Sequence, residues 1–130
     1  MAAPNTPSSW RTALGRTSGA WGDAAWYDLH LERKLPLAAP MLRELVFACP
    51  PANGKAVCDL LAGSGRVTAA LAAAYPRARI TMVDQSEERL AIARARVHES
   101  TAVRAVVAGV DAAAAALPGT PEGGFDIIVA

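Results

Sequence analysis

The chain has 130 residues, of which 52% are hydrophobic, and 13 basic and 12 acidic side chains leave a formal net charge of +1. This length allows one domain with a hydrophobic core, and the balanced charge argues against a nucleic-acid or acidic-membrane partner. No run of about 18 apolar residues is present, so no membrane span is predicted. Cys49 and Cys58 form no C-x-x-C pair, and we predict reduced thiols in a cytoplasmic protein.

The first part of the chain is predicted to be a flexible tail followed by two helices. Residues 1–22 are rich in Pro, Ser and Thr and lack the apolar core of a secretory signal, although a transit peptide would have a similar composition. Apolar residues recur at helical spacing over 23–34 and again over 37–49, where Pro40 falls in the first turn. The segment PPANG at 50–54, which is rich in helix-breaking residues, then separates these helices from the rest of the chain.

The central feature of the sequence is a strand, a glycine turn and a helix. Residues 56–61 form an apolar run that only Asp59 interrupts, as expected of a buried parallel strand. The turn AGSG at 62–65 lacks large side chains where the chain must turn sharply and let a ligand approach its backbone. A helix-compatible run begins at Arg66 and ends before Pro76. This order is typical of the first unit of a nucleotide-binding α/β fold.

The rest of the chain repeats the alternation of strand and helix. Ser86 is a natural N-cap for the second helix of this series, and two acidic residues in its first turn suit the helix dipole. The predicted elements are a strand at 79–84, a helix from 87 to 97, a strand at 103–108, a short helix at 112–117 and a strand at 125–130. Such an order predicts a parallel sheet with right-handed crossovers.

The residues that flank the glycine turn indicate which kind of ligand it would bind. A dinucleotide loop needs a small third residue in G-x-G-x-x-G, and Thr68 stands at that position. Asp59, at the carboxyl end of the strand, would repel a phosphate but would favour an ammonium group through a charge-assisted hydrogen bond. S-adenosylmethionine carries an ammonium group and no phosphate.

Four motifs in order make the chain similar to the class I S-adenosylmethionine-dependent methyltransferases over about residues 24–130. They are DLLAGSG at 59–65, Asp84 at the end of the second strand, GVDA at 109–112, and the segment 117–129 that leads into the fourth strand. One departure is Leu61, which stands where the family usually has its first glycine.

The resemblance implies a fold and a set of cofactor contacts. The fold is a Rossmann-like three-layer α/β domain at 23–130, with N-terminal helices and a parallel sheet of strand order 3-2-1-4. Asp84 would bind the ribose hydroxyls and Asp111 the adenine. The residues expected to hold S-adenosylmethionine are Asp59, Ala62, Gly63, Ser64, Gly65, Asp84, Gln85 and Asp111.

Some of these residues have a structural alternative. Asp59 could tie down the glycine loop, and Asp111 could cap the short helix after it. A capping role for Asp84 is less favoured because Ser86 already supplies the cap. Trp26 and Tyr27 could cover the cofactor, as N-terminal helices often do in this family, or could attach their helix to the sheet.

The expected function is methyl transfer to a small-molecule acceptor that the sequence does not identify. Neither a catalytic residue nor a metal cluster is predicted, because the sulfonium is already activated and positioning supplies much of the rate. Two alternatives are a non-catalytic S-adenosylmethionine-binding remnant and a nicotinamide-dependent oxidoreductase domain. The family's sheet continues beyond its fourth strand, so the resemblance implies a domain truncated there. We therefore expect self-association at that strand, or a partner that supplies the C-terminal half.

Overall fold

A computed structural model describes residues 23, 24, 26–29, 36–117 and 124–130, and divides the chain into two compact units, 1–38 and 39–130. In the first unit, Ala24 and residues 26–29 are helical. Asp23 Oδ1 accepts a hydrogen bond of 2.8 Å from the backbone N–H of Trp26, as expected at the start of a helix. The predicted tail at 1–22 and most of the helix predicted to end at 34 lie outside the described residues.

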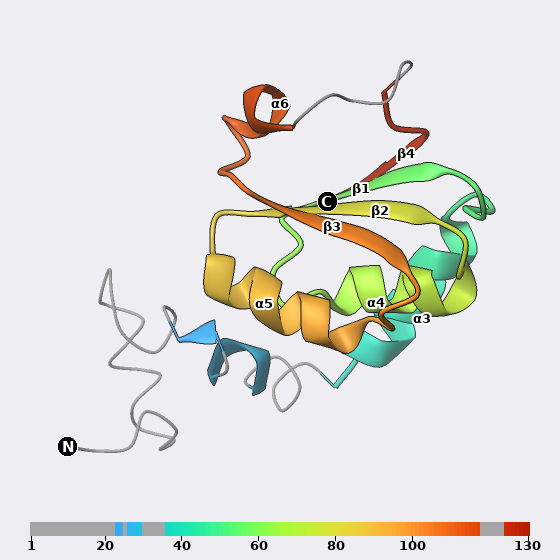
Figure 1. The fold of residues 1–130 in the computed structure, drawn as a ribbon. Helices are drawn as coiled ribbons and strands as arrows, with labels where there is room; N and C mark the ends of the chain where they lie inside the picture. Colours follow the sequence, from blue (N-terminus) through green and yellow to red (C-terminus); the bar gives the residue numbers. More distant parts are fainter. Residues whose placement is uncertain (1–22, 25, 30–35, 118–123) are drawn as a thin grey trace. The chain divides into compact units, whose positions relative to one another are not determined.

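The second unit contains a parallel sheet of four strands. These are β1 (Ala56–Leu60), β2 (Arg79–Asp84), β3 (Ala102–Val107) and β4 (Ile127–Val129), in the order β3-β2-β1-β4 (Figure 1). This result confirms the predicted Rossmann-like fold and the strand order 3-2-1-4. Because all four strands are parallel, their carboxyl ends share one edge of the sheet, and the order reverses between β1 and β4.

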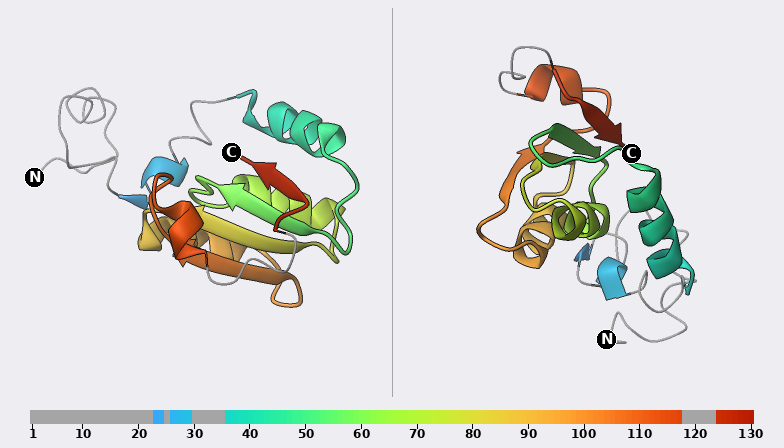
Figure 2. Two further views of the ribbon diagram at one scale, coloured as in Figure 1. Left: turned by 90° about the horizontal axis from the view of Figure 1, so that it is seen from above. Right: turned by 90° about the vertical axis from the view of Figure 1, so that its right-hand side faces the viewer.

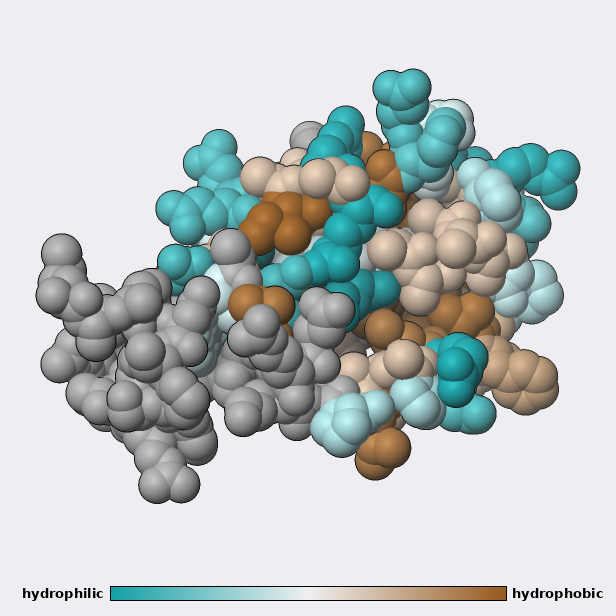
Figure 3. All heavy atoms as spheres, turned by 90° about the horizontal axis from the view of Figure 1, so that it is seen from below, coloured by the Kyte–Doolittle hydropathy of each residue, from teal (hydrophilic) through white to brown (hydrophobic). Residues whose placement is uncertain are grey.

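Four helices accompany the sheet: α3 (Ala38–Ala48), α4 (Arg66–Ala74), α5 (Glu87–Arg96) and α6 (Ala113–Ala116). Helices α4 and α5 lie on one face of the sheet and α6 on the other (Figures 1 and 2). Seen from the side of α4 and α5, the surface carries both hydrophilic and hydrophobic patches (Figure 3). Within the described part of the chain, no helix is both long and apolar enough to cross a bilayer.

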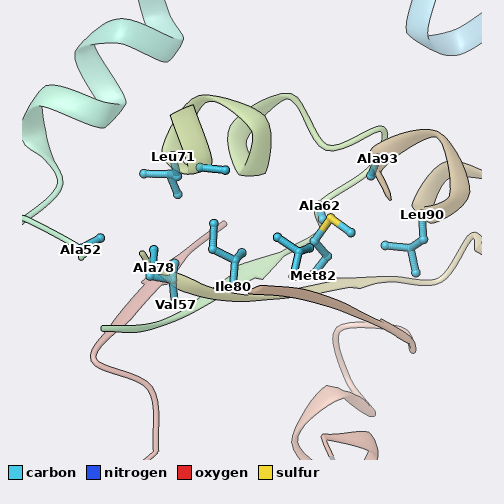
Figure 4. Packing of buried hydrophobic residues seen from close by; sticks show 11 residues of the cluster. Ala52, Val57, Ala62, Leu71, Ala78, Ile80, Met82, Leu90 and Ala93 are labelled. Atoms are coloured by element: carbon cyan, nitrogen blue, oxygen red, sulfur yellow. The ribbon is translucent and has the colours of Figure 1, made fainter. Parts of the chain in front are cut away.

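The main core lies between the sheet and the two helices α4 and α5. Leu71 of α4 and Leu90 of α5 pack there with Ile80 and Met82 of β2, and all four side chains are buried (Figure 4). The alanines around them are small, so both helices can lie close to the strands. A smaller cluster on the opposite face includes Cys58, which is reduced and buried.

The element bounds follow the sequence prediction closely, with one larger difference at the fourth strand. This strand covers only Ile127–Val129, whereas 125–130 was predicted. Asp126 is attached to β1 in another way, since its Oδ2 accepts the N–H of Ala56 at 2.9 Å and its own N–H donates to the carbonyl of Ala56 at 2.8 Å. The carboxylate of Asp126 thus accepts the N–H of Ala56, where a backbone carbonyl would accept it in a regular strand pair. In the sheet order β4 is an edge strand, and its self-association stays a prediction.

Candidate functional site

The candidate site is the loop between β1 and α4 together with the end of β2. The N–H of Ala62 donates to the carbonyl of Val83 at 2.9 Å, and the N–H of Gly65 donates to the carbonyl of Ala62 at 3.0 Å. These bonds hold the loop against the end of β2 and turn the chain into α4, which begins at Arg66. The side chains of Ala62 and Ser64 are buried, so mainly the backbone of the loop is open to a ligand.

The carboxylate of Asp84 joins this loop to the end of β2. Its Oδ2 accepts the backbone N–H of Gly63 at 2.9 Å, and its Oδ1 accepts that of Ser86 at 2.9 Å. Ser86 in turn caps α5, as predicted, because its Oγ accepts the N–H of Arg89 at 3.3 Å. Each carboxylate oxygen has two lone pairs, so Asp84 retains one acceptor site on each oxygen. Two neighbouring hydroxyl groups could use these sites.

Asp59, the fourth residue of β1, is only 3% exposed. Thr68 of α4 donates its hydroxyl to Asp59 Oδ2 at 2.5 Å. Burial raises the pKa of Asp59, hydrogen bonds from the side chain and backbone of Thr68 oppose this rise, and the charge of Asp84 adds to it. The contact with Thr68 supports the loop-tying role, whereas a ligand contact of Asp59 stays a prediction.

Thr68 was missed as a site residue by the sequence analysis, where it counted only as a break in the dinucleotide pattern. Its position in the first turn of α4, opposite an acidic residue at the end of β1, is the signal that could have identified it.

Gly63 and Gly65 are required in the loop for different structural reasons. Both have positive φ, +57° at Gly63 and +80° at Gly65. A Cβ at Gly65 would lie 2.4 Å from the Cβ and 2.7 Å from the Cα of Ala93 in α5, whereas a Cβ at Gly63 would have none of the described residues beyond its chain neighbours within 4 Å. Gly65 is therefore needed for packing within the protein. The space above Gly63 is open to a ligand.

The remaining predicted residues, Gln85 and Asp111, follow the ends of β2 and β3 and are exposed. The N-cap of α6 is Ala112 rather than Asp111, and it makes no side-chain capping hydrogen bond. A Cβ at Gly109 would lie 2.8 Å from Asp111 Oδ1, so this glycine lets the carboxylate fold back toward the end of β3. The ligand contact of Asp111 stays a prediction.

The described part of the chain offers no competing metal site, and one hollow lies elsewhere on the sheet. No group of three or more His, Cys, Asp or Glu among the described residues could hold a metal ion. A hollow of about 450 Å³ beside Ala56, Arg79 and Arg104 lies at the amino-terminal halves of the strands. It shares no residue with the loop or with Asp84.

The raised pKa of Asp59 leads to a prediction about stability and pH. A carboxyl whose pKa is higher in the folded chain than its ordinary value of 3.8 binds its proton more tightly when folded. Stability should therefore fall as the pH rises from about 4 through the raised pKa. We expect Asp59→Asn, which carries no charge, to lose less stability over this range. Denaturant unfolding at a series of pH values from about 4 to 7 measures the difference.

Thr68→Val provides the companion variant, since it keeps the side-chain shape but removes the hydroxyl donor. It should raise the pKa of Asp59 further and extend the pH range over which stability is lost. Parallel pH profiles for the wild type and Asp59→Asn would contradict the assignment of this dependence to Asp59.

Comparison with known proteins gives one family and several solved structures. The model of a family described as "Methyltransferase domain" matches residues 57–130. A precorrin-6Y C5,15-methyltransferase of Geobacter metallireducens is 20% identical with a TM-score of 0.55, and the match covers 65% of this chain and 46% of that one. The C-terminal domain of the Rhodobacter capsulatus precorrin-6Y C5,15-methyltransferase is 27% identical with a TM-score of 0.52, over 61% and 44%.

A third similar structure was solved with ligands. Coclaurine N-methyltransferase, bound to N-methylheliamine and S-adenosylhomocysteine (SAH), is 22% identical with a TM-score of 0.54, and the match covers 69% of this chain and 26% of that one. The chain thus spans less than half the length of these three structures. Among curated proteins, none matches it significantly.

Proposed function

This chain belongs to the family of methyltransferase domains, and from that membership we propose that it binds S-adenosylmethionine and transfers the cofactor's methyl group. The site proposed for the cofactor is the edge formed by the ends of β1 and β2, within residues 39–130. One observation carries the proposal: the carboxylate of Asp84, at the end of β2, accepts the N–H of Gly63 on one oxygen and that of Ser86 on the other, and so holds the glycine loop. A ribose offers two neighbouring hydroxyls to such a carboxylate.

Two further features of the loop support the proposal: the open space beside Gly63 and the hydrogen bond between Asp59 and Thr68. Apart from Gly63 and its two chain neighbours, no atom of the described residues lies within 4 Å of where a Cβ of Gly63 would be, which leaves room for a ligand at the backbone there. The hydrogen bond between Thr68 and Asp59 joins α4 to the end of β1, and the buried negative charge of Asp59 favours a cationic ligand. When bound, the cofactor supplies a methyl group already activated on its sulfonium. The work of the chain is to hold and orient it.

We propose further contacts at the ends of β2 and β3. Gln85 and Asp111 are exposed, so both are free to meet a ligand that extends from Asp84 along this edge. Asp111 would then bind the adenine amino group, as the family resemblance implies.

For the methyl acceptor, we propose a small molecule. The support is the likeness to the Rhodobacter capsulatus domain, which is named for its action on precorrin-6Y. None of the described residues is assigned to bind the acceptor, and a turnover assay over a panel of small acceptors is the direct test. Cofactor binding without turnover on any acceptor would favour the non-catalytic alternative.

Calorimetric titration with S-adenosylmethionine, SAH and NAD tests the cofactor assignment. We expect both sulfur compounds to bind, and NAD to bind at least about tenfold more weakly, because its pyrophosphate would approach the buried charge of Asp59. Tighter binding of NAD would reverse the assignment in favour of a nicotinamide-dependent domain.

A further inference from the structure

The outer edge of β3 is closed over only part of its length. β3 stands at the end of the sheet opposite β4, and within the described part of the chain no strand pairs with its outer side (Figure 1). Backbone N–H and C=O groups along such an edge can pair with a strand of another chain, so proteins commonly close their edges. The register of β3 shows which of its groups are open.

Alternate residues of β3 turn their backbone groups away from β2. The N–H of Ala108 donates to the carbonyl of Asp84 at 3.0 Å, and Asp84 is in register with Val107. In a parallel pair, every second residue of a strand bonds to the same neighbour. The even-numbered residues of β3 therefore bond to β2. The N–H and C=O groups of Val103, Ala105 and Val107 point outward.

Contacts within the chain close the first of these three residues. The N–H of Val103 donates to the carbonyl of Thr101 at 2.9 Å, and the guanidinium of Arg94 in α5 donates to the carbonyl of Val103. No such bond to a described residue uses the outward groups of Ala105 and Val107. Both residues are exposed, Val107 to 55%. The open part of the edge is residues 105–107, with two donors and two acceptors.

The same segment of a second copy fits this open edge in one register. In an antiparallel pair, opposite residues alternate between those that exchange two hydrogen bonds and those that exchange none. When Val106 lies opposite Val106 of a second copy, Ala105 lies opposite Val107, and each such pair exchanges two bonds. All the open groups of both copies are then used. A two-fold axis through Val106 relates the copies, so the contact closes as a dimer.

The side chains agree with this register. Ala105 and Val107 share a sheet face with Val103, which belongs to the main core, because alternate residues of a strand point to the same side. Their exposed apolar side chains would face each other across the pair and become buried. Arg104 would lie opposite Ala108, four residues or about 14 Å along the strand from its own counterpart. Like charges are therefore kept apart.

We infer that residues 105–107 of β3 are a self-association surface, through which two copies of the chain form one continuous sheet. The inference does not depend on the proposed function, and this surface is separate from β4. Because the contact is only three residues long, the dimer should be weak, and its population should rise with protein concentration. The bond from Arg94 to Val103 confines the pairing to this segment.

Two proline variants test the surface, because proline removes one backbone N–H. Ala105→Pro removes an outward N–H from each copy, which is two of the four bonds between them. We expect dimerisation at least about tenfold weaker, with the melting temperature close to that of the wild type. Val106→Pro removes an N–H that donates to β2 and should lower the melting temperature. Light scattering over a concentration series and thermal unfolding measure the two effects.

A cysteine variant tests the register. In a Cys49→Ser background, Val106→Cys places two thiols opposite each other in a pair without hydrogen bonds, where Cβ atoms lie about 4.5–5.5 Å apart. Mild oxidation should link these copies but should not link those of the control, Arg104→Cys in the same background. The remaining thiol, that of Cys58, is buried. Equal cross-linking of the two variants would overturn the register.

Three other results would overturn the inference itself. The first is a wild type that stays monomeric over the whole concentration series. The second is association that is unchanged in Ala105→Pro, which would assign it to another surface such as β4. The third is an equal fall in melting temperature for the two proline variants, because the N–H of Ala105 would then belong to the chain's own sheet.

Discussion

We expect Gly65→Ala to lower the free energy of unfolding by about 2–4 kcal/mol, because it combines a left-handed alanine with an overpacked contact. The added Cβ would lie 2.4 Å from the Cβ of Ala93 and 2.7 Å from its Cα. The second of these atoms is backbone, so α5 must move away from the loop. A domain of this size has only about 5–15 kcal/mol to lose. Denaturant unfolding followed by circular dichroism measures the change.

Gly63→Ala is the matched control for this prediction. It has the same sign of φ, but beyond its chain neighbours no atom in the described part of the chain would lie within 4 Å of its Cβ. Its loss of stability should therefore be limited to about 1–2 kcal/mol of backbone strain. Equal losses for the two variants would show that the contact with Ala93 is unimportant.

A double variant tests the contact directly. Ala93→Gly removes one of the two close atoms, so it should recover part of the stability of Gly65→Ala. Because the Cα of residue 93 remains, and glycine is itself unfavourable within a helix by about 1 kcal/mol, recovery should be incomplete. Additive losses in the double variant would mean that the two residues do not interact.

The bounds of most elements could be predicted because local signals mark them. Pro76 marks the end of α4 and Ser86 caps α5, and the apolar run of β2 lies between the charged residues Arg79 and Asp84. Prediction and structure agree on these three elements. The strand order came from the family resemblance rather than from any pattern in the chain. Local sequence does not indicate which strand pairs with the other edge of β1, and in the structure that strand is β4.

The contacts that assemble the site could not be predicted in the same way. The bond from the N–H of Gly63 to Asp84, and the packing of Gly65 on Ala93, join residues far apart in the sequence. Such contacts depend on how closely α5 and the loop approach one another, which composition and periodicity do not contain. The sequence indicated candidate residues for the site, and their contacts with a ligand stay predictions. Their double role in holding the loop appears only in the structure.

We expect Asp84→Ala to weaken SAH binding by about 1.5–3 kcal/mol, the range for hydrogen bonds to a charged group, or about 10- to 150-fold. The same variant should also destabilise the free protein. Asp84 accepts the N–H groups of Gly63 and Ser86, and each amide left without a partner costs about 1–3 kcal/mol where water cannot replace the carboxylate. Calorimetry and thermal unfolding of the same samples measure the two effects.

Asp84→Asn separates the ligand contact from the structural one. Its amide oxygen can still accept one of the two backbone N–H groups, so it should be more stable than Asp84→Ala. It lacks the second acceptor oxygen and the charge, however, and should still bind SAH at least about tenfold more weakly than the wild type. Glu88→Gln, which neutralises an exposed carboxylate on α5, is the control for general loss of charge. If Asp84→Asn bound SAH as tightly as Glu88→Gln does, the carboxylate would have a role in the loop alone, and the ribose contact would have to be assigned elsewhere.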